Sequence, residues 1–347
     1  MAQRGIVLMN LGSPNSTSVK DVRIYLDEFL MDKRVIDLPY IARLLLVKGV
    51  IVPFRAPRSA AAYRTIWTKD GSPLVVVTRQ LQAALQQEIE EPVEIAMRYG
   101  DPSPANAFDA LSKKVKDLEE VLLIPMYPHY AMSSYETAVE YAREIHQKKK
   151  YPFKLTVVPP FYNAPAYLEA LTESMRPYLQ QEYDHIVFSY HGIPERHIIK
   201  GDVTGNHCLK TPNCCEVNSE AHRQCYRHQC LTTTRLAAEK LGIPADKYSY
   251  AFQSRLGRDE WLKPYTAARL EEMPKEGIKK LIIVCPAFVS DCLETLEEIA
   301  DQGKESFMHA GGESFTLIPC MNVHPLWVKA IAGMCKFEND SMAQSGH

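Results

Sequence analysis

An α/β fold with two parallel sheets is predicted by three features of this 347-residue sequence. Short apolar runs alternate with amphipathic helical segments along the chain, as in parallel sheets covered by helices. The runs are apolar without alternation, which is typical of strands buried on both faces. The length favours two such units. We expect a first domain over residues 1–150, a second over 151–336 and a flexible tail over 337–347.

The expected strands end at Gly, Pro or aromatic residues. The first, residues 5–11, stops at Gly-Ser-Pro, and the helix over 16–30 follows it with apolar residues at helical spacing behind a Ser/Thr cap. Further strands are expected, each before a possible helix, at residues 121–127, 154–161, 185–190, 248–252, 281–286 and 315–319. Ligands of open α/β sheets bind beyond the carboxyl ends of the strands, so the residues after these runs are the first candidates for chemistry.

The composition excludes some classes of function. A formal net charge of -2 offers no basic surface for nucleic acid. The first residues, MAQRGIVLMN, have no secretory leader, so we expect a cytoplasmic protein. The most apolar stretch, residues 41–54, carries Arg43 and Lys48 and is too short to span a bilayer. It is therefore expected to rest on a membrane surface at most.

His191 follows the apolar run 185–190 and precedes a Gly-Ile-Pro turn. A histidine in such a place often does no more than cap a strand end through hydrogen bonds. A neutral imidazole at the carboxyl end of a buried strand also suits a general base or a transient metal ligand near neutral pH. His191 is therefore a catalytic candidate.

Three carboxylates follow the run 281–286. Asp291, Glu294 and Glu298 are spaced so that one face of an α-helix would carry all three. A solvated acidic face near a helix amino terminus is the plainer explanation. Next to a pocket, the same cluster would attract a divalent cation or pass protons, because like charges raise some carboxyl pKa values.

Aromatic and hydroxyl side chains gather from Tyr127 to Tyr135, after the run 121–127. Core packing accounts for some of them. Together with Trp261, they are suited to line a flat apolar ligand whose edge needs polar contacts.

Five of the nine cysteines lie between Cys208 and Cys230. In a reducing compartment, clustered cysteines are more often metal ligands than disulfide partners. The segment 201–230 has few apolar residues to offset the entropy of ordering it, and metal ligation would supply that free energy. A metal centre is the leading interpretation.

Six motifs, in order along nearly the whole chain, closely resemble those of the ferrochelatase family: GIVLMNLGSP, AMRYG, MYPHY, SYHGIPERH, FQSRLGRDEWLKPYT and PAFVSDCLETLEEI. The resemblance implies two Rossmann-like domains with parallel sheets flanked by helices, the type II chelatase fold, around a porphyrin cleft. It implies insertion of Fe2+, a substrate here, into protoporphyrin IX, with release of two protons, in the last step of haem synthesis. No nucleotide cofactor is implied.

The resemblance also assigns residues. His191 and Glu294 correspond to the catalytic pair and to the residues that meet Fe2+, and Asp291 and Glu298 match the acidic path for protons or metal. An active-site lip is expected over about 41–67. Porphyrin contacts are implied for Met9, Arg64, Arg98, Tyr127, Trp261 and Phe288.

Some bacterial relatives carry a [2Fe-2S] cluster on an internal insertion, and residues 201–230 resemble that type. Cys208, Cys215, Cys225 and Cys230 are the preferred ligands, with Cys214 as a possible substitute because adjacent side chains tend to point apart. Structural zinc is the alternative, supported by three histidines of the segment, His207, His222 and His228.

Other functions stay open. A coproporphyrin substrate, a non-catalytic haem or porphyrin carrier, and a metal-insertion step in cobalamin or sirohaem synthesis are the rivals; the SDCLETLEEI and GRDEWLKPY motifs favour ferrochelatase. The MNLGSP start favours protoporphyrin over coproporphyrin. The lip offers a peripheral contact with the inner membrane. The chain is expected as a monomer or a homodimer.

Overall fold

The computed structural model describes residues 3–255, 257 and 259–337. The chain folds into two compact units, one made of residues 1–126, 132–159 and 327–347 and the other of 127–131 and 160–326. The expected tail over 337–347 lies outside the described residues except for Phe337.

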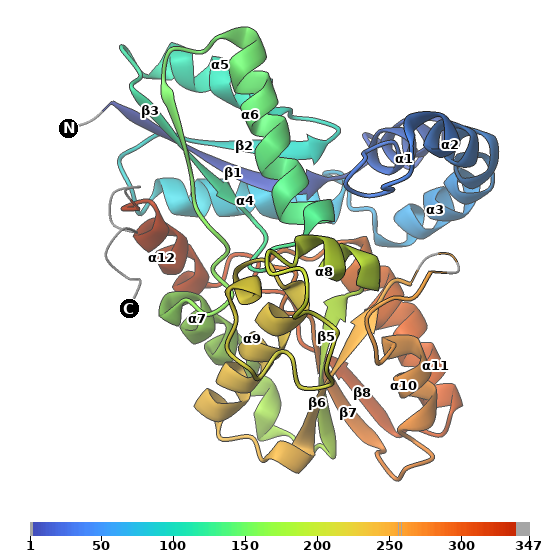
Figure 1. Ribbon diagram of the computed structural model, residues 1–347. Coiled ribbons are helices and arrows are strands. Elements are labelled where there is room, and N and C mark those ends of the chain that lie inside the picture. Colours follow the sequence, from blue (N-terminus) through green and yellow to red (C-terminus); the bar gives the residue numbers. More distant parts are fainter. Residues whose placement is uncertain (1–2, 256, 258, 338–347) are drawn as a thin grey trace. The chain divides into compact units, whose positions relative to one another are not determined.

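The first unit contains a four-stranded parallel sheet in the order β2-β1-β3-β4. Helices α4, α5 and α6 pack against it (Figure 1). Arg4 of β1 donates to the carbonyls of Cys335 and Phe337, which ties the end of α12 to this unit. The elements are β1 (Arg4–Gly12), β2 (Val93–Tyr99), β3 (Glu120–Pro125), β4 (Lys154–Val157), α4 (Pro73–Gln86), α5 (Pro104–Lys114), α6 (Thr137–Lys149) and α12 (Pro325–Met334).

A separate helical group of the first unit comprises α1 (Val19–Leu30), α2 (Tyr40–Leu46), the π-helix η1 (Val47–Ile51) and α3 (Val52–Ile66), drawn in blue in Figure 1. Ser18 caps α1 by accepting from the Asp21 N–H. The ring of Tyr25 meets those of Tyr63 and Tyr99 edge-on, so aromatic packing joins α1 to α3 and to β2. No helix in the described parts of the chain is long and apolar enough to cross a membrane.

The second unit has a parallel sheet in the order β6-β5-β7-β8. Numbered within each sheet, the two strand orders are the same, and residues 117–127 and 277–288, whose sequences echo each other, contain the third strand of each sheet. The elements are β5 (His185–His191), β6 (Tyr248–Gln253), β7 (Lys280–Val284), β8 (Ser314–Leu317), α7 (Pro165–Met175), α8 (Glu195–Gly201), α9 (Tyr226–Leu241), α10 (Thr266–Glu272), the π-helix η6 (Glu294–Gly303) and α11 (Lys304–His309), with short 3-10 turns between them.

Two features differ from the sequence expectation. The expected boundary at residue 150 assigned residues 154–161 to the second domain, whereas β4 pairs with β3 in the first sheet and α12 packs largely with the first unit. Strand β2 was not expected as a strand. It lies at the edge of its sheet and carries Glu94 and Arg98 at half-buried positions, so its run is interrupted by charges that a central strand would exclude.

Candidate active site and cysteine-rich segment

His191 is the last residue of β5 and is half-buried at the carboxyl end of the second sheet. Its Nδ1 lies 2.6 Å from the Gly192 carbonyl oxygen. A carbonyl only accepts hydrogen bonds, so Nδ1 carries the proton in the neutral ring and Nε2 keeps a free lone pair. The ring of Phe288 meets the imidazole edge-on, with centroids 6.3 Å apart. This geometry leaves Nε2 as the basic atom.

Glycine is required next to this histidine. A Cβ on Gly192 would lie 2.7 Å from the Gln253 carbonyl oxygen and 3.2 Å from the Trp261 ring. Trp261 therefore packs directly over the turn that follows His191. Its buried indole N–H has no hydrogen-bond partner among the described residues. An aromatic wall with an unused donor thus lies beside the catalytic candidate.

Glu294 and Glu298 both lie on η6 and are half-buried. Glu298 accepts from the Ser254 N–H at 2.7 Å, from the Ser254 hydroxyl at 2.5 Å and from the Gln253 amide at 3.3 Å. Burial raises the pKa of Glu298, and the negative charge of Glu294 acts in the same direction. The Ser254 hydroxyl, the positive charge of His191 and the Gln253 amide oppose the rise. A carboxyl that holds its proton more tightly than usual therefore interacts electrostatically with His191.

The sequence predicted three carboxylates in a row on one face of an α-helix, and this prediction is wrong. The segment is a π-helix that begins at Glu294, and Asp291 precedes it. The Asp291 carboxylate accepts from Asn322 at 2.6 Å, from Thr295 at 3.1 Å and from the Cys320 N–H at 3.2 Å. The π-helical turn is wider than an α-turn, so the α-helical spacing does not set the face. Asp291 fastens a neighbouring loop and is 9% exposed.

Gln253 and Ser254 were missed as site residues. Gln253 also donates to the Glu294 carbonyl at 3.0 Å and accepts from Ser189, so it fixes the start of η6 to β6. Ser254 has φ of 67°, a left-handed conformation that is uncommon for serine. Their position directly after a strand was the available signal, but it carries no information about which carboxylate they bind.

The other expected porphyrin contacts fall into both units. Tyr127, in the segment 127–131 of the second unit, is buried, and Phe288 packs on the core below β7. Met9 is fully buried in β1 of the first unit. Arg64 is exposed in the last turn of α3 and makes no ion pair within the described ranges.

Arg98 differs from Arg64 because its charge is already matched inside the first unit. It donates to Asp32 at 2.6 Å and to Thr137 at 2.7 Å, and its guanidinium lies over the rings of Tyr99 and Tyr141. Burial would raise the pKa of Asp32. Hydrogen bonds from Thr137 and from the Arg34 backbone outweigh burial, together with the charge of Arg98 and a hydrogen bond from Tyr99, and they lower it.

The cysteine-rich segment joins α8 to α9, and its thiols are all unoxidised. Cys225 caps α9, with its sulfur 3.5 Å from the His228 N–H. Burial raises the pKa of Cys208 to about 11, and Cys225, Cys214 and Cys215 also act on that pKa. Cys225 and burial raise the pKa of Cys215, and the charge of Cys215 acts in turn on Cys230. The thiols of the segment are therefore electrostatic neighbours, and Cys225 acts on both Cys208 and Cys215.

Positive charge and N–H donors surround this group. Arg227 lies 3.3 Å from the Cys215 sulfur and 3.8 Å from that of Cys214, which also accepts from the Leu209 N–H at 3.4 Å. Cys230 is fully buried further along α9, where it is hydrogen-bonded to Tyr226. Its pKa is raised by burial.

The three histidines of the segment bind backbone. His207 and His222 lie 2.7 and 3.1 Å from the Cys214 carbonyl, and His228 lies 2.8 Å from that of Cys215. The rings of His222 and His228 stack with centroids 3.6 Å apart. Within the residues described, no group of three or more His, Cys, Asp or Glu side chains is arranged to hold a metal ion.

Solved structures define the class of this protein. The structure titled SirB from Bacillus subtilis with Fe3+ aligns with 99% of this chain over 98% of its own length. The two sequences are 14% identical, and the TM-score is 0.54. The sirohydrochlorin chelatase SirB from Bacillus subtilis subspecies spizizenii in complex with cobalt covers 96% and 93%, with a TM-score of 0.50 and 11% identity. The fold is that of the two-unit α/β chelatases, as the sequence predicted.

Sequence relatives give the family. Residues 3–338 match the ferrochelatase family. A ferrochelatase of Pseudomonas entomophila is 50% identical over 97% of this chain and 99% of its own, and one of Pseudomonas fluorescens strain Pf0-1 is 51% identical over 97% and 98%. The chain belongs to the ferrochelatase family.

Proposed function

We propose that this protein is a metal chelatase, a lyase of haem biosynthesis, that inserts Fe2+ into protoporphyrin IX. Family membership over nearly the full chain supports the reaction. The observation that supports its site is a histidine with a free Nε2 that interacts electrostatically with Glu298, whose pKa is raised. In the reaction two pyrrole N–H protons leave and Fe2+ forms four Fe–N bonds, two to the freed lone pairs and two to the lone pairs of the other two ring nitrogens, so the charge of Fe2+ balances the two protons released without any oxidant.

His191 is the proposed acceptor of a pyrrole proton. Its neutral form has Nε2 unprotonated, and the imidazolium that forms on proton transfer is stabilised by the carboxylates of Glu294 and Glu298. Glu298 can pass a proton onward because its pKa is raised toward neutrality. Ser254 and Gln253 keep that carboxylate in place by three hydrogen bonds. Glu294 is the proposed partner of the incoming Fe2+, whose charge it neutralises.

The apolar macrocycle is proposed to contact Trp261, Phe288 and Tyr127 of the second unit. Arg64 is the better candidate for a propionate, because its guanidinium is exposed and has no ion pair among the described residues. Arg98 would have to exchange its bond to Asp32 for one to a propionate.

A metallation assay tests the function. Purified protein should insert Fe2+, and Zn2+ as a substitute, into protoporphyrin IX faster than into coproporphyrin. His191→Ala should abolish turnover while circular dichroism and the melting temperature stay those of the parent. Wild-type protein that binds porphyrin and never metallates it would favour the carrier alternative. Faster metallation of coproporphyrin would make coproporphyrin the substrate and leave the proposed reaction, Fe2+ insertion, unchanged.

We also propose that the cysteine-rich segment binds a [2Fe-2S] cluster. The Arg227 guanidinium lies near the sulfurs of both Cys214 and Cys215, and Cys225 acts on the pKa values of Cys208 and Cys215, so we favour the ligand set containing Cys214 over the one containing Cys230. N–H donors and the Arg227 charge near the sulfurs suit an anionic iron–sulfur centre. The described side chains form no preassembled metal site, so the thiols must rearrange when the cluster binds.

Iron and sulfide analysis tests the cluster. Anaerobically purified protein should be reddish-brown and hold about two iron and two sulfide per chain. Serine at position 215 or 225 should remove the colour. Cys230→Ala is the matched control, because it removes a buried thiol of the same segment and should keep the iron. A colourless protein holding one zinc would refute the cluster and support the zinc alternative.

A membrane contact is proposed for the helical group of α2, η1 and α3. Its exposed apolar residues are Tyr40, Ile41, Leu45, Val50 and Phe54, with exposed fractions between 53% and 73%. Val52, in the same stretch, is 4% exposed and belongs to the core. Ile41→Asp and Phe54→Asp should weaken binding to anionic liposomes and leave the melting temperature unchanged. Liposome binding equal to that of the parent would contradict the proposed membrane contact.

A further inference from the structure

Tyr226 connects the cysteine-rich segment to the catalytic candidate. It is the first residue of α9 and directly follows Cys225. Its hydroxyl donates to the backbone carbonyl of His191 at 2.9 Å. The side chain is 4% exposed and packs edge-on against His129.

The contact belongs to a continuous face of α9. Tyr226, Cys230 and Thr234 follow at four-residue intervals, so they lie on one side of the helix. Thr234 shares a hydrogen bond of 2.7 Å with the Tyr190 hydroxyl. The last two residues of β5 are therefore each bonded to α9, Tyr190 through its side chain and His191 through its backbone.

The chemistry of the two partners fixes the direction of the bond between Tyr226 and His191. A carbonyl oxygen only accepts hydrogen bonds, so the Tyr226 hydroxyl is the donor and the His191 carbonyl is the acceptor.

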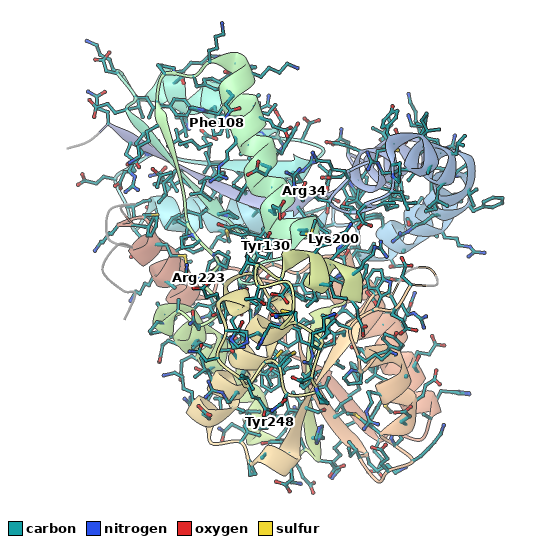
Figure 2. All side chains as sticks on the ribbon, viewed as in Figure 1. Arg34, Phe108, Tyr130, Lys200, Arg223 and Tyr248 are labelled. Carbon is teal, nitrogen blue, oxygen red and sulfur yellow. The ribbon has the colours of Figure 1, made fainter. Side chains whose placement is uncertain are left out.

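A further residue in the first turn of α9 also holds the helix. Gln229 accepts from the Tyr130 N–H at 2.7 Å and donates to the Arg223 carbonyl at 2.9 Å; Figure 2 labels both Tyr130 and Arg223. The start of α9 is thus fixed between the cysteine-rich segment and the strand end. A shift of the cap at Cys225 would be passed to Tyr226, since the two residues are adjacent.

We propose that Tyr226 is a positioning residue for His191, and that through it the order of the cysteine-rich segment sets the orientation of the catalytic imidazole. The inference rests on the proposed role of His191. A hydrogen bond to the backbone carbonyl restrains the peptide from which the imidazole extends, and a small misplacement of a catalytic group costs much more rate than binding.

The kinetic test compares two matched phenylalanine variants. Tyr226→Phe removes the hydroxyl next to His191, whereas Tyr190→Phe removes an equally buried hydroxyl that bonds to the same helix and not to His191. We expect kcat to fall roughly tenfold in Y226F with an unchanged KM for porphyrin. In Y190F we expect a lower melting temperature and the kcat of the parent. Equal kcat losses in both variants, or none in Y226F, would overturn the proposal.

A spectroscopic readout separates this inference from the proposed function. In histidine-labelled protein, the His191 ring signals, assigned by their loss in His191→Asn, should shift in Y226F and stay in place in Y190F. Cys225→Ser alone should shift the same signals, and Cys225→Ser combined with Y226F should shift them no further than Y226F does. Unmoved signals in Y226F overturn the inference even where metallation is observed. If Y226F shows the shifts but the wild-type protein does not metallate porphyrin, the proposed function is refuted and the positioning role of Tyr226 stands.

Discussion

The two units bury charge in opposite ways. In the first, Arg98 is paired with Asp32, and the pKa of Asp32 is lowered. In the second, Glu298 is held by neutral donors close to another carboxylate, and its pKa is raised. One group is charge-matched and favours a single ionisation state. The other is mismatched and can exchange a proton, which is what the removal of pyrrole protons needs.

Replacing Glu294, a member of the mismatched group, should give the largest effect on metallation. Glu294→Gln keeps the shape of the side chain and removes the charge proposed to meet Fe2+. We expect kcat for metallation to fall by roughly a thousandfold with little change in porphyrin affinity, measured by fluorescence quenching. Weaker porphyrin binding at unchanged kcat would assign Glu294 to the pocket wall.

Breaking the matched pair should cost stability instead. The side chains of Asp32 and Arg98 are 4% and 12% exposed, so Asp32→Asn leaves a buried guanidinium without its counter-charge. We expect a loss of about 3 kcal/mol in the free energy of unfolding, measured with urea. Enzyme that remains folded should metallate at nearly the parent kcat. An Asp32→Asn variant with the urea midpoint of the parent and a low kcat would contradict this expectation, because the pair would then serve activity and not stability.

The two groups should respond oppositely to pH. The folded protein holds the Glu298 proton more tightly than the unfolded chain, so stability is lost as pH rises from the ordinary value of 4.5 toward the raised pKa. The lowered pKa of Asp32 means that stability is lost as pH falls below 3.8. Urea titrations of Glu298→Gln and of Asp32→Asn should each remove one of these slopes. Parallel profiles for the parent and both variants would contradict both assignments.

The smallest effect is expected at the surface. Arg64→Gln removes an exposed guanidinium from α3, and we expect KM for a dicarboxylate porphyrin to rise roughly fivefold, as one exposed charge pair would give. Thr65→Ala, next to it and also exposed, is the control and should leave KM unchanged. A porphyrin diester whose KM rises as much in Arg64→Gln as that of the dicarboxylate would remove Arg64 from propionate binding.

Apolar runs were enough to predict most of the fold. Seven of the eight strands in the described residues lie where runs such as 185–190 indicated. The central strands β1, β3, β5 and β7 are buried along nearly their whole length, which leaves a continuous apolar signal. Strand β2 was missed because Glu94 and Arg98 interrupt its apolar run. At the candidate site, His191 and Glu298 were predicted from their positions after strands. The role of Ser254 was not, because a backbone N–H has no signature in sequence.

The choice of cluster ligands shows a second limit. Spacing alone favours Cys230 over Cys214, because neighbouring side chains point apart in a strand. Residues 202–219 lie in turns and bends, where successive side chains can share a direction, and the Arg227 guanidinium lies within 3.8 Å of the sulfurs of both Cys214 and Cys215. The ligand set stays a prediction, which the iron analysis of the serine and alanine variants tests.

The number of residues in the π-helix η6 sets how the two carboxylates of the candidate active site are directed. Each residue advances an α-helix by about 100° and the wider π-helix by less, so a deletion between Glu294 and Glu298 would rotate one carboxylate well away from its present direction relative to the other. A chain that had lost Leu296 would still contain every catalytic side chain, yet Glu298 would point away from Ser254. We therefore expect related sequences to show substitutions in this segment far more often than insertions or deletions. The number of residues in the segment should stay constant where their identities vary.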